Sequence, residues 1–264
     1  MVRHRRGGAI MVTIFRLVLS CLIALSITVG SYAADKTQIR ELLLKHYRLE
    51  RPEGPGPFPA VMMVPGCSGF DADFQKEFYN GVQSQLVALG FVTLRVNSLA
   101  VRHATSCWQG IYPADGANDI YIAAEYLLQQ PFVKKGAINI IGWSWGGAAA
   151  LSALRPAESQ EAIPVDAVVA YFPACNYVQT WDSEIPVLVL VGSLDNVAPY
   201  SKCEKLFSSV PQPDKITVRI YDGAHHAFDN FTLPAEMQYR FGTLGYNEAA
   251  AKSAWKEVTN FLRK

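Results

Sequence analysis

The sequence predicts an α/β domain in which a mostly parallel central sheet is covered by helices on both faces. Short apolar runs alternate along the chain with segments of helical spacing, which implies parallel strands joined by right-handed crossovers. The apolar runs are continuous, as is typical of strands buried on both faces. Half of the 264 residues are hydrophobic, which is enough to fill the core of one domain of this size.

The expected elements follow one another in a regular order. An antiparallel edge strand is expected over residues 43–49, before a Pro/Gly-rich loop over 51–59. Buried strands are expected at 60–64, 91–96, 137–142, 165–171, 186–192 and 216–221. The spacing of apolar residues predicts helices over 74–89, 115–130 and 147–154, and a closing helix that contains Trp255, Val258 and Leu262. In open sheets of this kind the functional groups gather at the carboxyl ends of the strands.

The first 33 residues predict a secretory signal peptide. Basic residues, among them Arg3 and Arg16, lead into an uncharged apolar run over 17–29, and the small residues Ser31 and Ala33 follow. The apolar run is shorter than the roughly 20 residues that a spanning helix usually needs. We expect cleavage after Ala33, which leaves 34–264 as a single exported domain, periplasmic or secreted, with no stable membrane insertion. The alternative is an uncleaved amino-terminal anchor.

Four cysteines remain after this cleavage, and export makes disulfide bonds the expected state for them. They are Cys67, Cys107, Cys175 and Cys203. Four cysteines allow three pairings, and their spacing does not choose among them. The alternative is four buried, reduced thiols.

A nucleophile is predicted at Ser144. It lies in the stretch Gly-Trp-Ser-Trp-Gly-Gly over 142–147, directly after an apolar strand and before a helix of small residues. A G-x-S-x-G motif in that context is typical of a nucleophile elbow, a sharp strained turn that exposes the serine at the edge of the sheet. A simple Gly/Ser turn without chemistry is the alternative.

A serine hydroxyl needs a base that is oriented by an acid, and in this arrangement the chain order is Ser, Asp or Glu, then His. Asp195 follows the strand over 186–192, and His225 and His226 follow the strand over 216–221. Both positions are strand ends, so the order and the placement agree. Residues that fit less well in order or place are His46, His103, Asp182 and Asp222.

These motifs resemble those of the dienelactone hydrolase family, which has the α/β-hydrolase fold. The elbow over 142–147 is similar to the family's G-x-C/S-x-G-G motif, and the stretch 223–228 is similar to its G-A-x-H-x-F histidine motif. The resemblance implies that His226 is the catalytic histidine, that His225 is the variable position, and that Asp195 is the acid. Because the elbow carries Ser144 where the best-known members have cysteine, the resemblance implies a general ester or lactone hydrolase.

The resemblance also implies an oxyanion hole formed by the backbone N–H groups of Trp145 and Cys67. A disulfide between Cys67 and Cys107 would brace that loop, and one between Cys175 and Cys203 would tie neighbouring loops. The family's substrate-binding arginine beyond the histidine is absent here, where the sequence reads Asp-Asn-Phe over 229–231. Arg102 is a candidate for a single contact with a substrate carboxylate, and a solvated loop arginine is the alternative.

The prediction is therefore an exported serine hydrolase that cleaves small carboxylic esters or lactones. The alternatives are a hydrolase of another acyl substrate, such as a peptide amide or a polyester, and a non-catalytic binding protein on the same scaffold.

The segments 97–112 and 231–246 are rich in aromatic residues and form either a pocket wall or ordinary loop anchors. A formal net charge of +1 gives no reason to expect a nucleic-acid partner, and no metal or other cofactor is expected. The sequence gives no basis for an oligomeric state.

Overall fold

The computed structural model describes residues 37–155 and 164–263. The predicted signal peptide, 1–33, lies outside the described residues. The chain divides into two units, residues 1–42 and 43–264. In the first unit the structure describes only residues 37–42, which are helical. The sheet, its covering helices and the candidate site all lie in the second unit.

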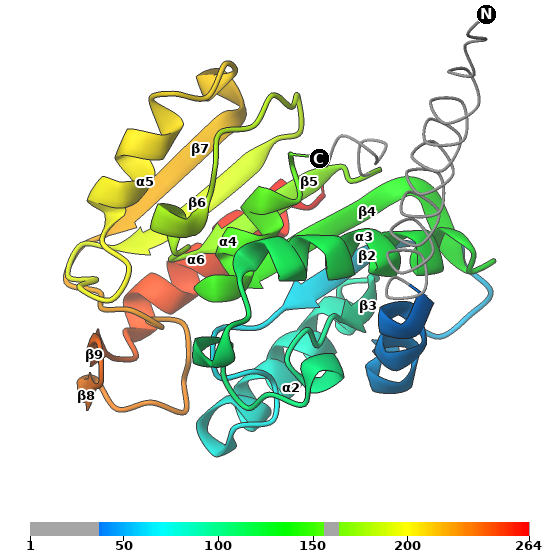
Figure 1. The fold of residues 1–264 in the computed structure, drawn as a ribbon, viewed down its shortest axis with the longest axis horizontal. Coiled ribbons are helices and arrows are strands. Elements are labelled where there is room, and N and C mark those ends of the chain that lie inside the picture. The colour runs from blue at the N-terminus through cyan, green and yellow to red at the C-terminus, as the bar shows by residue number, and fades with distance from the viewer. Residues whose placement is uncertain (1–36, 156–163, 264) are drawn as a thin grey trace, which may run out of the picture. The chain divides into compact units, whose positions relative to one another are not determined.

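The second unit is built on a seven-stranded sheet with the order β1-β3-β2-β4-β5-β6-β7 (Figure 1). The strands are β1 Arg48–Glu50, β2 Phe58–Val64, β3 Val92–Arg95, β4 Val133–Trp143, β5 Ala167–Tyr171, β6 Val187–Gly192 and β7 Ile216–Tyr221. All neighbours pair in parallel except β1, which is antiparallel to β3. The predicted mostly parallel α/β fold is thus confirmed.

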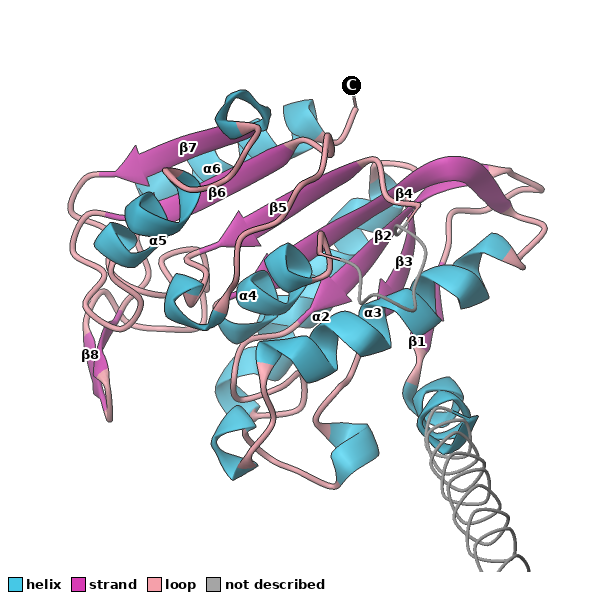
Figure 2. Cartoon of the chain, turned by 45° about the horizontal axis from the view of Figure 1, so that its top comes forward, coloured by secondary structure: helices cyan, strands magenta, loops and turns pink. Residues whose placement is uncertain are grey.

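Helices cover both faces of this sheet, as Figures 1 and 2 show. They are α2 Asp73–Ala88, α3 Pro113–Leu128, α4 Trp145–Ser152, α5 Tyr200–Phe207 and α6 Glu248–Phe261. Alternate residues of the central strands, such as Val61 and Met63, pack with α2 and α6 in one core cluster. The other face is covered by α3 and α4, which pack against each other and against β2 and β4. This two-faced burial explains the continuous apolar runs.

Three features differ from the sequence-based expectation. Residues 43–46 are helical, so the antiparallel edge strand is limited to Arg48–Glu50. The helix α5 was not expected, because few of its residues are apolar and buried. The hairpin of β8 Met237–Tyr239 and β9 Gly242–Leu244 was also not expected. Strands of three residues are too short to display a period-two pattern.

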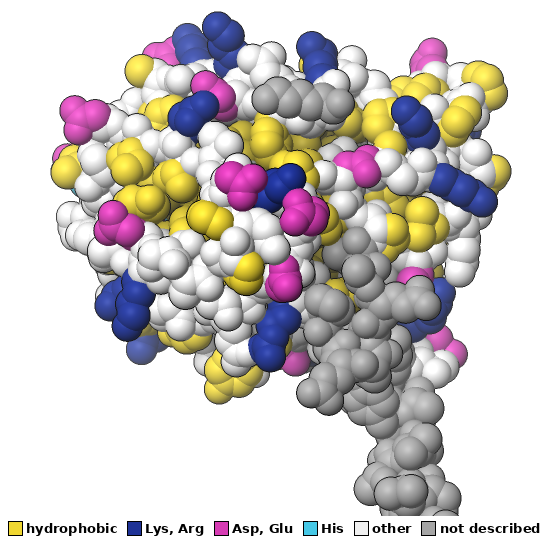
Figure 3. Space-filling view, turned by 90° about the horizontal axis from the view of Figure 1, so that it is seen from above, with side chains coloured by type: hydrophobic (Ala, Val, Ile, Leu, Met, Phe, Trp, Pro, Cys, Tyr) yellow, Lys and Arg dark blue, Asp and Glu magenta, His cyan; other side chains and the backbone are white. Residues whose placement is uncertain are grey.

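The surface drawn in Figure 3 shows basic and acidic side chains interspersed, without a large patch of one sign. Within the described residues, no helix has both the length and the apolar character needed to cross a membrane.

Candidate active site

The sheet order brings the three predicted residues to one edge. Ser144 directly follows β4, Asp195 follows β6, and His226 lies in the loop after β7. Because these strands are parallel, their carboxyl ends lie on the same side of the sheet, and loops far apart in the sequence meet there.

The turn at Ser144 has a strained backbone. Its φ of 53° and ψ of −112° are unusual for a residue with a side chain, and its N–H is held by a 2.9 Å hydrogen bond to the carbonyl oxygen of Tyr171. A Cβ atom on Gly142 would collide with the carbonyl oxygen of Gly146, and one on Gly146 would collide with that of Val64. Glycine is therefore required at both positions for strand and helix to approach so closely.

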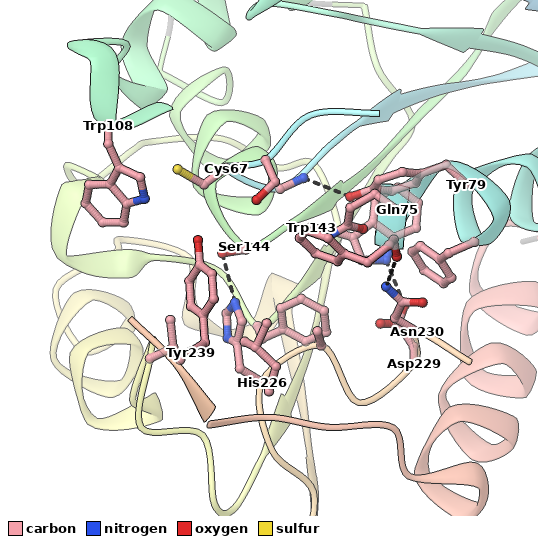
Figure 4. Close-up of a pocket in the computed structure, with 18 residues that line it drawn as sticks. Cys67, Gln75, Tyr79, Trp108, Trp143, Ser144, His226, Asp229, Asn230 and Tyr239 are labelled. Carbon is pink, nitrogen blue, oxygen red and sulfur yellow. Dashed lines mark hydrogen bonds between the residues drawn. The ribbon is translucent and has the colours of Figure 1, made fainter. Parts of the chain in front are cut away.

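A continuous hydrogen-bonded chain joins the three side chains, and Figure 4 shows its step from Ser144 to His226. The distance from Ser144 Oγ to His226 Nε2 is 3.0 Å, and that from His226 Nδ1 to Asp195 Oδ2 is 2.7 Å. The second carboxylate oxygen of Asp195 accepts hydrogen bonds from the backbone N–H groups of Val197 and Ala198, at 2.9 and 2.8 Å. Asp195 and His226 are both buried, so the imidazole is held in one orientation with Nε2 toward the serine.

The two predicted oxyanion donors lie beside this chain. Trp145 is the first residue of α4, and the first N–H groups of a helix have no partner within the helix. Cys67 follows Gly66, whose own N–H donates to Tyr79 Oη at 2.9 Å. The carbonyl oxygen of Cys67 accepts from the N–H of Cys107 at 2.9 Å, so the loop that carries the Cys67 N–H is fixed on both sides.

Two disulfide bonds are present among the described residues. Cys67 is bonded to Cys107 and Cys175 to Cys203, with Cα–Cα distances of 4.8 and 5.0 Å. These are the two pairs named in the sequence analysis. The first joins the candidate oxyanion loop to the aromatic segment 97–112, and the second joins the loop after β5 to α5.

Two hollows meet at Ser144. We call the smaller one, of about 70 Å³, the inner cavity; its lining includes Tyr79, Trp143, His226, Asp229 and Tyr239. We call the larger one, of about 510 Å³, the outer groove; its lining includes Trp108, Tyr112, Tyr177 and Phe241, four exposed aromatic residues. Trp108 lines both hollows, and its ring packs against that of Phe241 with 4.3 Å between centroids. The hairpin β8–β9 thus forms part of the wall, with Tyr239 and Leu244 on the inner cavity and Phe241 on the outer groove.

Asp229 is a site residue that sequence reasoning missed. It lines the inner cavity three residues beyond His226, and its Oδ2 accepts a 2.7 Å hydrogen bond from Trp143 Nε1. Burial raises the pKa of Asp229 to about 7, although the hydrogen bond from Trp143 and the nearby His226 oppose this shift. The only signal in the sequence is a carboxylate in the stretch 229–231, where the family's substrate-binding arginine is absent.

Arg102 is placed neither in contact with the site nor free in solvent. Its guanidinium forms a two-pronged salt bridge with the fully buried Asp119, at 2.6 and 3.2 Å, and also donates to the carbonyl oxygen of Ser98. It lines neither the inner cavity nor the outer groove. The contact of Arg102 with a substrate carboxylate stays a prediction, and the salt bridge with Asp119 of α3 is the contact that the sequence did not indicate.

The other histidine and aspartate candidates lie outside the hydrogen-bonded chain. His225 Nε2 is 3.6 Å from Glu236 Oε1, and its side chain does not line either hollow. Asp182 accepts a hydrogen bond from Gln212, and Asp222 accepts one from Ser193 Oγ.

Residues 46–264 match the family model described as the dienelactone hydrolase family. The chain belongs to the dienelactone hydrolase family. As a member of it, the chain is a hydrolase that acts on ester bonds and has the α/β-hydrolase fold.

Individual relatives of this dienelactone hydrolase family member are distant. A Bradyrhizobium protein named "Probable 2-oxo-3-(5-oxofuran-2-ylidene)propanoate lactonase" is 25% identical over 237 residues, which cover 81% of this chain and 87% of the relative. A dienelactone hydrolase-like promiscuous phosphotriesterase from metagenomic libraries has a similar structure, with a TM-score of 0.64 and 21% identity over 82% of this chain and 91% of its own. The propionate-bound esterase 2 of Thermogutta terrifontis has a TM-score of 0.57 and 13% identity over 81% and 86%. These two structures support the fold.

Proposed function

We propose that this protein is an exported serine hydrolase that cleaves small carboxylic esters or lactones through Ser144, His226 and Asp195. The observation that carries the proposal is the hydrogen-bonded chain from Ser144 Oγ through both ring nitrogens of His226 to Asp195 Oδ2. Nucleophile, base and orienting acid stand in the order and contact that acyl transfer needs.

In the first half of the proposed reaction, Ser144 Oγ attacks the carbonyl carbon of the ester while its proton passes to His226 Nε2. The imidazolium that results is stabilised by Asp195, to which Nδ1–H remains bonded. The negative charge that develops on the carbonyl oxygen is stabilised by the N–H groups of Trp145 and Cys67. His226 then gives its proton to the alkoxide as the C–O bond breaks, which leaves an acyl group on Ser144.

In the second half, a water molecule takes the place of the alcohol. It loses a proton to His226 Nε2 as its oxygen attacks the acyl carbon, and His226 returns that proton to Ser144 Oγ as the acyl–enzyme bond breaks. The products are one carboxylic acid and one alcohol, or a single hydroxy acid when the substrate is a lactone.

Small substrates are favoured by the shape of the inner cavity. Its volume of about 70 Å³ is much smaller than the volume of about 510 Å³ of the aromatic outer groove, so it suits a short chain better than a bulky one. The lactonase in the name of the Bradyrhizobium relative agrees with a compact cyclic ester as one substrate class.

Export is part of the proposal. The two disulfide bonds are typical of an oxidising compartment, and the first 33 residues have the composition of a signal peptide. We place the mature enzyme in the periplasm or outside the cell.

The central test is the variant Ser144→Ala. We expect it to abolish turnover of a chromogenic short-chain ester and covalent labelling by a fluorophosphonate probe, because no other hydroxyl among the described residues is bonded to His226. A variant at an exposed serine, Ser208→Ala, is the matched control and should keep both activities. Full turnover by Ser144→Ala would contradict the proposed nucleophile, and labelling without turnover of any ester would point to a different acyl substrate.

A polyester is the second candidate substrate, and one observation favours it. The outer groove is open, is lined by four exposed aromatic side chains, and ends at Ser144, so it could bind one segment of an aromatic polymer chain. Release of soluble acid from a polyester film, compared with turnover of a short soluble ester, separates the two substrates.

A further inference from the structure

We propose that Asp229 determines the specificity of the inner cavity: it selects against esters that carry a carboxylate and favours esters that carry a cation or a hydrogen-bond donor. This inference rests on the proposed function, because it concerns the substrate that Ser144 attacks.

The position of Asp229 connects it directly to the nucleophile. Its Oδ2 is fixed by Trp143 Nε1 at 2.7 Å, and Trp143 immediately precedes Ser144. Its Oδ1 is enclosed and has no hydrogen-bond partner among the described residues. One oxygen of the carboxyl group is thus held in place by Trp143, while the other is buried without a partner, so that a negative charge on this group is only partly compensated. Figure 4 shows Asp229 on one side of Ser144, with Trp108 and Tyr239 on the other.

No fixed positive charge balances this carboxyl group. Among the described residues that line the inner cavity, none is lysine or arginine. The groups that face Asp229 from the packed elements are Tyr79 of α2, Tyr171 of β5 and Lys252 of α6.

Neither the two tyrosines nor the lysine neutralises Asp229. Burial raises the pKa of both Tyr79 and Tyr171, so these phenols are uncharged near neutral pH. Lys252 lines a second hollow between α2 and α6, which Asp229 also lines, but it is exposed and is bonded through Nζ to Glu248 Oε1 at 2.7 Å. His226, which is needed for the reaction itself, is the remaining group of opposite charge when it is protonated.

The charge of the substrate therefore matters in this cavity. A substrate carboxylate would place a second negative charge beside Asp229 without a cation to pair with, which is costly in an enclosed site. A substrate cation, or the positive end of a hydrogen-bond donor, would instead be attracted to the carboxylate. Because the pKa of Asp229 is about 7, its own charge, and with it the discrimination, increases as the pH rises from 6 to 8.

The experiment compares matched pairs of small esters and uses the whole enzyme. In one pair the charge is on the acyl side: methyl pentanoate against monomethyl glutarate. In the other it is on the alcohol side: acetylcholine against its uncharged carbon isostere, dimethylbutyl acetate. The quantity measured is the ratio of kcat/KM within each pair. Both members of a pair react through the same catalytic groups, so the dependence of those groups on pH cancels in the ratio.

We expect at least one pair to show a preference on the order of tenfold or more at pH 8, against the anion or for the cation, and a smaller preference at pH 6. The variant Asp229→Asn retains an acceptor for Trp143 Nε1 and should remove most of that preference and its dependence on pH. Asp222→Asn, at an exposed carboxylate away from the cavity, is the matched control and should retain both.

Two results would overturn the inference. One is a ratio close to unity for both pairs in the wild-type enzyme at every pH, which needs no variant and so does not depend on how Asp229→Asn folds. The other is a preference that Asp229→Asn leaves unchanged. Failure of the proposed function would look different, because the uncharged esters would then show no turnover that depends on Ser144.

Discussion

The carboxyl group of Asp229 makes folding stability depend on pH. Its pKa in the folded protein is about 7, raised from 3.8 chiefly by burial. The native state therefore holds this proton more tightly than the unfolded chain does, so the stability that it contributes is present at low pH and is lost as the pH rises from about 4 to about 7.

Asp229→Asn removes this dependence, because the amide does not ionise. We expect the stability of the variant relative to the wild type to rise between pH 5 and pH 8, by an amount on the order of 1–3 kcal/mol. Urea unfolding at both pH values measures the difference, with Asp222→Asn as the control. The outcome that would contradict this is a stability difference, variant minus wild type, that is smaller at pH 8 than at pH 5. The carboxylate of Asp229 would then not be destabilised by its burial.

At the scale of an element, the loop that carries Cys67 depends on its disulfide. The bond to Cys107 and the 2.9 Å hydrogen bond between the same two residues hold the candidate oxyanion donor in place. The double variant Cys67→Ser/Cys107→Ser should lose about 2–4 kcal/mol of stability. It should also lose at least about tenfold in kcat toward a short ester, since one misplaced oxyanion donor costs about 10²–10³ in rate.

The second disulfide supplies the control for this prediction. Cys175→Ser/Cys203→Ser opens a loop of comparable length, 28 residues against 40, so its cost in stability should be similar. Cys175 and Cys203 line neither hollow, so kcat measured well below the unfolding temperature should change little. Equal losses of kcat in the two double variants would show that only stability is affected.

The hairpin β8–β9 shows which elements the sequence could not predict. The inner strands of the main sheet, β2 to β6, were predicted to within a few residues, because each contains a run of apolar residues buried on both faces. The hairpin is held instead by contacts with distant residues: Asn196 Oδ1 accepts from the N–H of Thr243 at 2.8 Å, and the ring of Phe241 packs against that of Trp108. No local pattern in the sequence encodes contacts between residues so far apart. The sequence therefore left open whether the segment with Tyr239 and Phe241 forms a pocket wall or only anchors a loop.

The same distinction holds for the candidate site. Ser144, Asp195 and the pair His225–His226 could be named because each follows a strand, and parallel strands send their loops to one edge. The resemblance to the dienelactone hydrolase family then singled out His226 from the pair. Asp229 could not be named, because its properties depend on burial by Tyr79 and Tyr171, which come from a distant helix and a distant strand. The salt bridge of Arg102 with Asp119 was missed for the same reason.

For the whole molecule, the oxidation state of the cysteines tests export and signal cleavage together. Thiol titration of the denatured protein, purified from the oxidising compartment, should detect no free thiol if cleavage follows Ala33, because Cys21 is then absent and the other four cysteines are paired. One free thiol would indicate that the segment with Cys21 is retained. Four or more would contradict the two disulfides, and the amino-terminal residue, expected at Ala34, gives an independent readout.

The collision that a methyl group on Gly146 would have with the carbonyl oxygen of Val64 has a consequence for protein engineering. The elbow and the neighbouring loop have no spare space, so laboratory evolution toward new esters should find few tolerated changes there. The aromatic rim formed by Trp108, Tyr112, Tyr177 and Phe241 is exposed, and libraries directed at those four positions should yield altered substrate range while the turnover machinery stays intact.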